Sequence, residues 1–339
     1  MDSLTHIAFG AALGETLVGN KIGRRAMLWG AALATLPDLD ILIPHDSYIA
    51  RVSLHRSWSH SLLVMALVAP AIAWMLKRIP HWREVSFTRA TLCVYALLAT
   101  HALLDSFTVY GTQLLWPIPM EPISWSSVFI IDPLFSLPLF AAVFCTLIFR
   151  QANHRFHIAG LTIACAYLLW SLCVKIWIDS KVETALDKQH LAAKKYSTSP
   201  TAFNTLLWRA LVLDADGGDY REAYLSIFDG DTPLHFSVYP RNIQLLQHLN
   251  DSWAVKRLRW FTHGYYAVRR SDDDVVVEDL RMGMAGTYFF RYAVGELKDG
   301  KAQPIVDRRV SGERGTDMLP IIWARIFDPK VQLTPSAAP

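Results

Sequence analysis

The hydrophobic residues of this chain are concentrated in its first half, in long runs that carry almost no charge. Four of these runs, with their flanks, approach the ~20 residues that a membrane-spanning helix requires: Ser61–Leu76, Ala90–Leu104, Pro133–Phe149 and Ile158–Val174. Two shorter runs, Leu4–Val18 and Ala26–Leu36, predict a helical hairpin that either spans the membrane or re-enters it. The pattern therefore predicts about six helices in residues 1–180.

The pattern changes from Lys181 onward, where polar and apolar residues alternate over short segments. A polar helix is predicted over Lys181–Lys195 and another helix over Asn242–Asn250. Strands are predicted for runs bounded by turn residues: Thr205–Val212, Ala223–Ser226, Tyr265–Arg269, Val275–Leu280 and Tyr288–Ala293. We therefore expect a small α+β soluble domain over residues 181–331, followed by a disordered tail over 332–339.

The composition supports this division of the chain. Hydrophobic residues make up 52% of the sequence and charged residues 19%, which excludes a disordered chain. The first 180 positions hold 22 charged residues and the other 159 hold 41, the contrast expected between a membrane-embedded and a soluble domain. A formal net charge of +3 gives no reason to expect a nucleic-acid partner. The fold class predicted is thus an α-helical polytopic membrane domain followed by a small α+β domain.

The basic residues predict the orientation in the membrane. In the first half of the chain, most of them lie in three loops, after the first helix, after the Ser61–Leu76 run and after the Pro133–Phe149 run, whereas 108–131 contains no Lys or Arg. Arg51 and Arg56 lie elsewhere, in the loop 37–59, and count against this pattern. The positive-inside rule places these three loops in the cytoplasm. Six crossings then place the N-terminus, the loop 37–59 and the soluble domain outside the cytoplasm, in a multi-pass protein of the bacterial inner membrane.

Histidine and aspartate residues recur at one side of this predicted topology. The expected cluster comprises Asp2 and His6, Asp38 and Asp40, His55 and His60 with Arg56 between them, and His101 with Asp105. Ionisable residues near hydrocarbon are costly and usually functional. Simpler interpretations are hydrogen bonds between helices and, for Asp2 or Asp38, helix capping. Asp132 lies on the same side, and Asp2 and Asp132 are the candidates for supporting the ligands.

Imidazoles mixed with carboxylates are typical ligands of zinc, or of manganese or iron where oxygen ligands predominate. The set exceeds what a single zinc ion needs, so one or two divalent ions are predicted, able to activate water and hold a phosphoryl oxygen. Arg56 is predicted to bind a phosphate.

Four motifs in this order resemble those of the YdjM-like family of inner-membrane metal-dependent hydrolases. They are Asp2-Ser3-Leu4-Thr5-His6, Pro37-Asp38-Leu39-Asp40, His55-Arg56 with Ser59-His60-Ser61, and His101-Ala102-Leu103-Leu104-Asp105. The resemblance covers about residues 1–175, and 203–209 with 279–283 resemble the C-terminal extension of the longer members. It implies a divalent-metal hydrolase whose ligands are His6, Asp38, Asp40, His55, His60, His101 and Asp105. The chain departs from the family pattern at Ser57 and Ser59, where glycine and threonine are expected.

The function expected is hydrolysis of a lipid or lipid-linked phosphoester at the outer face of the membrane. Water activated by the metal would attack phosphorus, with Asp38 or Asp40 as the base and Arg56 holding the substrate. The His-x-x-x-Asp pair is similar to one in zinc-dependent phospholipase C, which favours phosphoesters by analogy. The alternative is a non-catalytic membrane regulator or scaffold with a structural metal site. The sequence leaves the oligomeric state, the metal and the bond cleaved undetermined.

Overall fold

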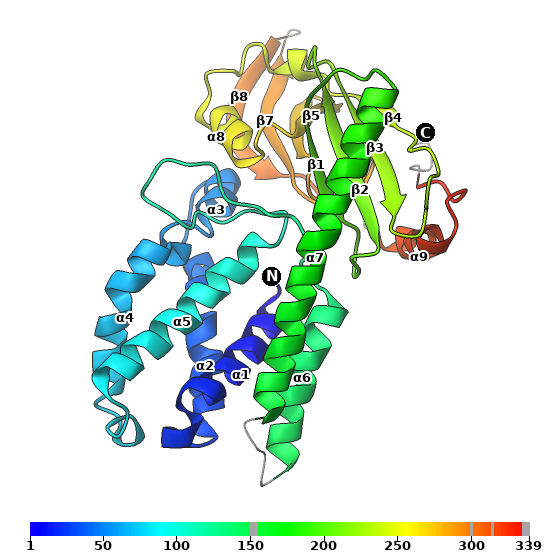
Figure 1. Ribbon diagram of the computed structural model, residues 1–339. Coiled ribbons are helices and arrows are strands. Elements are labelled where there is room, and N and C mark those ends of the chain that lie inside the picture. Colours follow the sequence, from blue (N-terminus) through cyan, green and yellow to red (C-terminus); the bar gives the residue numbers. More distant parts are fainter. Residues whose placement is uncertain (150–154, 299–300, 313–314, 334–339) are drawn as a thin grey trace. The chain divides into compact units, whose positions relative to one another are not determined.

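The computed structural model describes residues 1–149, 155–298, 301–312 and 315–333 (Figure 1). The chain forms two compact units. Unit 1 comprises Met1–Ile43 and His55–Leu172, and unit 2 comprises Pro44–Leu54 and Cys173–Pro339. Most of the tail predicted to be disordered, 334–339, lies outside the described residues.

Unit 1 is helical, and each of the six apolar runs folds as a helix. The helices are α1 (Ser3–Ile22), α2 (Arg25–Thr35), α4 (Leu62–Leu76), α5 (Phe87–Ser106), α6 (Pro133–Ile148) and the first part of α7 (Arg155–Lys188). Short 3₁₀ turns, η1 (Pro37–Leu42), η2 (Trp58–His60) and η3 (Pro80–Trp82), lie between them. Polar residues begin the helices as expected of N-caps: the side chains of Asp2, Ser61 and Ser86 accept backbone N–H bonds from α1, α4 and α5.

Glycines allow α1 and α2 to pack closely as a hairpin. A Cβ atom added to Gly30 would lie 2.1 Å from the carbonyl oxygen of Gly10, and one added to Gly14 would lie 2.5 Å from that of Ala26. Only residues without a side chain permit this approach of the two backbones. Both helices of the hairpin also contact α5.

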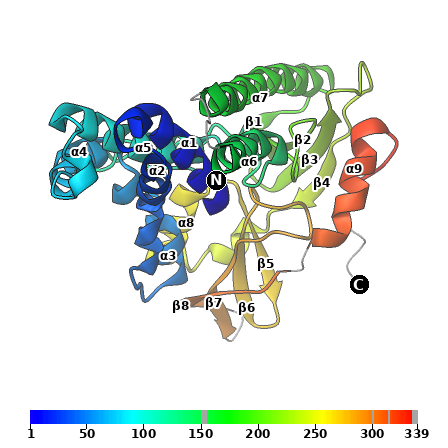
Figure 2. The ribbon, with the colours of Figure 1, turned by 90° about the horizontal axis from the view of Figure 1, so that it is seen from below.

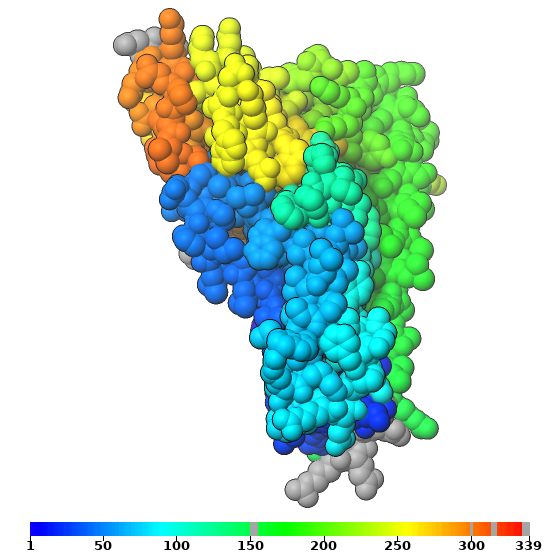
Figure 3. Space-filling model, turned by 90° about the vertical axis from the view of Figure 1, so that its left-hand side faces the viewer, coloured from blue at the N-terminus to red at the C-terminus, as the bar shows by residue number. Residues whose placement is uncertain are grey.

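Among the described residues, two helices, α5 and α7, are long and apolar enough to cross a membrane. A third candidate is the pair Tyr48–His60 and Leu62–Leu76, which bends by 58° at its break. Helices α4 and α5, which lie on the side of unit 1 shown in Figure 3, carry exposed apolar side chains such as Leu67, Met75 and Leu92, as expected of helices that contact lipid. The helical membrane region is confirmed, and its number of crossings stays a prediction.

Unit 2 contains two four-stranded antiparallel sheets, each with its strands in chain order (Figure 2). The first sheet contains β1 (Ala193–Pro200), β2 (Leu207–Asp214), β3 (Asp219–Ser226) and β4 (Ser237–Pro240). The second contains β5 (Tyr266–Ser271), β6 (Asp274–Asp279), β7 (Arg291–Lys298) and β8 (Lys301–Arg309). Leu211, Tyr220 and Tyr288 belong to a buried cluster that joins the two sheets.

Helices cover both sheets of unit 2. From Cys173 onward, α7 packs Val174, Ile178 and Val182 against the first sheet. The second sheet is covered by α8 (Trp253–Phe261), η4 (Ile243–Leu246) and α3 (Tyr48–Leu54), whose Ile49 is buried in the same core. Two further helical elements, η5 (Gly315–Met318) and α9 (Leu319–Phe327), follow the last strand.

Unit 2 differs from the sequence prediction in several elements. The helix predicted over Lys181–Lys195 is wrong beyond Lys188, because His190 adopts a left-handed conformation (φ 51°) and β1 follows. The helix predicted over Asn242–Asn250 is only a 3₁₀ turn, and the helix starts at Trp253, after the N-cap Ser252. The predicted domain boundary at residue 180 lies within α7, whose residues from 173 belong to unit 2.

Candidate metal centre

Four of the predicted ligands lie together where helices of unit 1 end. His101 and Asp105 are one turn apart at the end of α5, Asp38 is on η1 directly after α2, and His60 ends η2. Each offers one ligand atom, and these four atoms all lie within 4.8 Å of one another. The side chains of His60, His101 and Asp105 are fully buried, whereas that of Asp38 is 25% exposed. The cluster therefore has one solvent-accessible member.

The distances from each imidazole of this cluster to the other imidazole and to the two carboxylates fit a small tetrahedral ion. The Nε2 atoms of His60 and His101 are 3.1 Å apart. The Asp38 Oδ1 atom lies 3.5 Å from the first and 3.3 Å from the second, and the Asp105 Oδ2 atom lies 3.2 and 3.5 Å from them. Tetrahedral zinc with nitrogen and oxygen ligands at ~2.0–2.2 Å separates neighbouring ligand atoms by about 3.3–3.5 Å. The four residues thus fit one divalent ion.

Hydrogen bonds at the other ring nitrogens fix how both imidazoles face this cluster. His101 donates its Nδ1–H to the carbonyl oxygen of Ala34, at 2.6 Å. The Ser59 hydroxyl donates to the Asp40 carboxylate at 2.6 Å, so it accepts from His60 Nδ1–H at 2.9 Å. In the neutral form, each imidazole then has its lone pair on Nε2. Two such lone pairs 3.1 Å apart would repel each other, and a cation between them would remove that repulsion.

Asp105 divides its two oxygens between structural contacts and the cluster. Its Oδ1 atom lies 3.1 Å from both His6 Nε2 and Arg56 Nη2, and the Met1 amino group also contacts it. Its Oδ2 atom is buried and, in the described part of the chain, has no hydrogen-bond donor. A buried carboxylate oxygen without a donor is costly. A metal ion would satisfy it.

Asp40 and His55, which were predicted as ligands, lie beside the four-residue cluster. The Oδ1 atom of Asp40 accepts a hydrogen bond from His55 Nδ1 at 2.7 Å, and its Oδ2 atom accepts from Ser59. Burial raises the pKa of Asp40, but the bonds from His55 and Ser59 outweigh it and hold this pKa below its usual value. The ionised Asp40 orients His60 through Ser59, as carboxylates often orient metal-binding imidazoles.

Two more predicted site residues, His6 and Arg56, are buried around Asp105. The His6 ring stacks on that of His101, with 3.8 Å between the ring centroids. Arg56 has a left-handed backbone (φ 61°), and its Nη1 donates to Thr108 Oγ1 at 3.2 Å while its Nη2 contacts Asp105. Both terminal nitrogens are therefore engaged in this structure, and the predicted binding of phosphate by Arg56 stays a prediction.

Asp2 and Asp132 act as helix caps. Asp2 accepts from the backbone N–H of Thr5 at the start of α1. Asp132 caps α6 and accepts a hydrogen bond from Tyr167 at 2.8 Å. Their predicted support of the ligands stays a prediction.

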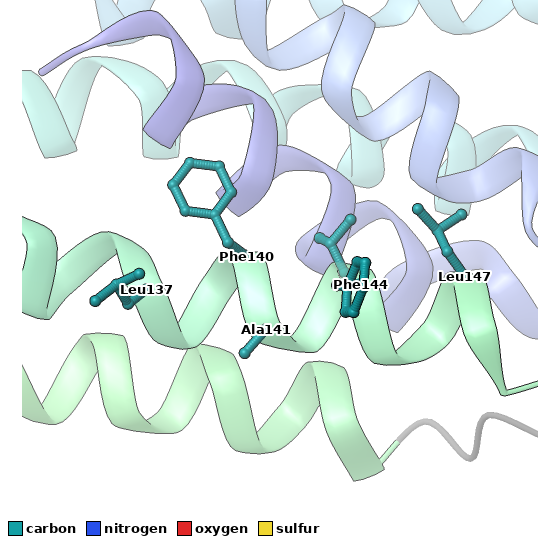
Figure 4. A pocket seen from close by; sticks show the side chains of 6 residues that line it. Leu137, Phe140, Ala141, Phe144 and Leu147 are labelled. Atoms are coloured by element: carbon teal, nitrogen blue, oxygen red, sulfur yellow. The ribbon is translucent and has the colours of Figure 1, made fainter.

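One surface depression of unit 1 is lined by apolar side chains alone. Figure 4 shows it along α6, where Leu137, Phe140, Phe144 and Leu147 project from the helix. A purely apolar lining on a helix of a membrane region is typical of a lipid-facing surface. The candidate centre is therefore the His/Asp cluster and not this depression.

Several groups that position the ligands carry little or no signal in the sequence. Ser59 stands out there only as a departure from the family pattern, although its place between Asp40 and His60 in the hydrogen-bond chain makes it part of the site. Thr108, three residues after Asp105, was detectable by its spacing. The Ala34 carbonyl oxygen gave no signal, because a backbone contact from another helix leaves no trace in residue types.

Comparisons with known proteins match the helical region. The family model described as "YdjM inner membrane protein" matches residues 1–178. The "Inner membrane protein YbcI" of Escherichia coli (strain K12) is 34% identical over 117 residues, which are 34% of this chain and 66% of that protein. The chain thus spans slightly less than two thirds of this relative. No solved structure matches the chain.

Proposed function

The chain belongs to the YdjM inner membrane protein family, and we propose that it is a membrane-bound, metal-dependent hydrolase. One observation carries the proposal: the Nε2 atoms of two buried imidazoles lie 3.1 Å apart, beside a buried carboxylate oxygen for which the described residues supply no hydrogen-bond donor. That donor set suits zinc first, with manganese or iron as alternatives. Asp40 and His55, next to the cluster, are the residues that would complete a site for a second ion.

A divalent cation held there would lower the pKa of water and polarise a phosphoryl oxygen. In the proposed reaction, the bond from the water oxygen to phosphorus forms as the bond to the leaving alcohol breaks. Asp38 is the preferred base, because it is the exposed carboxylate of the cluster while both oxygens of Asp40 accept hydrogen bonds. The proton then passes from Asp38 to the leaving oxygen. Arg56 would exchange its Thr108 contact for the substrate phosphate.

The proposed substrate is a lipid or lipid-linked phosphoester. His101 and Asp105 lie at the end of α5, a candidate membrane span, so a substrate anchored in the same membrane can present its headgroup there. Binding of the lipid in the bilayer would concentrate the headgroup at the site without a deep pocket.

The proposal is tested on the purified full-length protein in detergent, loaded with zinc or manganese and given phospholipid micelles and bis(p-nitrophenyl) phosphate. We expect metal-dependent release of the alcohol, reduced by roughly 100-fold or more in His101→Ala. His81→Ala is the matched control, because His81 accepts a hydrogen bond from Trp29 in another part of unit 1. A metal-loaded wild type that cleaves neither phosphoester, while retaining its ion, would contradict a phosphoesterase.

A non-catalytic regulator or scaffold is the second candidate, and the burial of the cluster favours it. Four protein ligands, three of them fully buried, match a closed structural zinc site, whereas catalytic zinc keeps one position open. X-ray absorption of the zinc-loaded protein separates the two functions. A coordinated water favours the hydrolase, and four protein ligands alone favour the regulator.

We also propose that unit 2 lies outside the cytoplasm. The support is the distribution of Lys and Arg, which gather at 21–25, 77–89 and 150–155 and are absent from 108–131. An alkaline phosphatase fusion after Pro200 should be active and one within 78–89 inactive. The same result from both fusions would contradict the proposed topology.

A further inference from the structure

Unit 2 contains the segment of α7 at which the candidate membrane span ends. Residues 158–174 carry no charge, and the next residues include Lys175, Asp179 and Lys181. Trp177 is 38% exposed between them, with the Lys181 amine 5.6 Å from its ring centroid. Tryptophan with a neighbouring lysine is typical of the boundary between hydrocarbon and headgroups. This boundary therefore lies near residues 175–181.

The contacts of Lys175 identify the end of the first sheet that lies at this boundary. Its Nζ atom donates to the carbonyl oxygen of Thr198 at 3.2 Å and to its Oγ1 at 2.7 Å. Thr198 is near the end of β1, and the antiparallel register then places Trp208 beside Pro200 and Leu225 beside Trp208. The β1 end, the β2 start and the β3 end thus lie toward the membrane.

Helix α9 packs at that same end of the sheet (Figure 1). The carbonyl oxygen of Ile326 accepts a hydrogen bond from Ser226, the last residue of β3, at 2.6 Å. Arg325 is buried and binds both oxygens of Asp229, at 2.8 and 2.7 Å. Helix α9 is therefore held rigidly by the part of unit 2 that lies toward the membrane.

The face of α9 opposite these contacts is apolar and open. Trp323 and Phe327 are exposed, and Phe327, at 70% exposure, stacks on Phe228, at 57%, with ring centroids 5.7 Å apart. Trp323 and Phe327 are four residues apart, so they share one face of the helix. An exposed patch of Trp and Phe on a short amphipathic helix is typical of insertion into the headgroup layer.

We propose that α9 and Phe228 lie in the headgroup layer of the membrane that α7 enters. The patch lies on the same unit as Trp177, at the end that faces the membrane boundary. This position favours lipid over a protein partner as the molecule that covers the patch. With α7 it attaches unit 2 to the membrane surface at two places. The inference does not depend on any enzymatic activity.

The test uses the full-length chain in nanodiscs, with its four cysteines replaced by alanine and one new cysteine carrying an environment-sensitive fluorophore. The probe positions are Phe327→Cys and, as an independent second position, Trp323→Cys. Asp216→Cys is the control, because Asp216 is exposed in the turn at the opposite end of the same sheet. Lipids brominated near the headgroup should remove roughly half of the fluorescence at 327 and 323 and leave 216 unchanged.

Equal quenching at all three positions would overturn the proposal. A second result would also overturn it. If a probe at 327 or 323 is not quenched by bromolipid but becomes shielded from water in detergent as the protein concentration rises, the patch is covered by a second copy of the chain. Each variant must retain the thermal transition of its cysteine-free parent.

Discussion

Metal binding by this protein should be lost when either imidazole of the cluster is removed. In His101→Ala or His60→Ala the remaining Nε2 atom and the two carboxylates provide only three ligands. The buried Asp105 Oδ2 atom also loses a neighbour, at 3.5 Å in the first variant and at 3.2 Å in the second. We expect the affinity for zinc to fall by at least roughly 100-fold. The measurement is competition with a chelator on the purified protein, followed by elemental analysis.

Variants of Ser59 test whether the hydrogen-bond chain to Asp40 orients His60. Ser59→Ala removes the hydroxyl that accepts from His60 and donates to Asp40, so we expect zinc affinity to fall by about 10–100-fold. Ser59→Thr keeps the hydroxyl and should bind like the wild type.

The two histidine variants decide whether the cluster is the metal site at all. Unchanged zinc affinity in both His60→Ala and His101→Ala would mean that the metal binds elsewhere.

The candidate centre was predictable because its chemistry is carried by residue types that are rare near hydrocarbon. His101 and Asp105, four apart in an apolar run, indicated a shared helix face, and the structure confirms that they lie together with Asp38 and His60. Which of the other residues face the ion and which hold the ligands in place was not predictable. It depends on which oxygen of Asp40 meets His55 and which meets Ser59, and this is set by the turns η1 and η2.

The fold was predictable wherever a run of residues has one clear periodicity. The apolar runs of unit 1 fold as helices, and β2, β3, β5, β6 and β7 overlap predicted strands. β1 and β8 were not predicted, because both are edge strands rich in basic residues and show no clear alternation of apolar and polar positions. Each is a strand only because it pairs with a neighbouring strand of its sheet. The assignment of residues 44–54 to unit 2 also escaped, since α3 is held there by packing of Ile49 and by a hydrogen bond from its N–H to Asp307.

Removing Glu222 should strongly destabilise unit 2. Its carboxylate forms an ion pair with the buried Arg209 and accepts hydrogen bonds from Tyr288 at 2.6 Å and Tyr224 at 2.9 Å. Burial and the charge of Glu222 raise the pKa of Tyr288 well above its usual value, so this hydroxyl stays protonated and donates. In Glu222→Ala the guanidinium remains buried without its anion, which costs about 3–5 kcal/mol of unfolding free energy.

The measurement is chemical unfolding of the full-length protein in detergent, followed by the fluorescence of its tryptophans. Asp251→Ala is the matched control, because the pair Asp251–Lys256 is exposed and such pairs contribute little to stability. The double variant Arg209→Met/Glu222→Leu should regain most of the loss, since apolar residues of similar volume replace buried ion pairs well. If Glu222→Ala leaves the free energy of unfolding unchanged, water must reach Arg209. The ion pair would then not be what holds β2 and β3 to the segment that contains Tyr288.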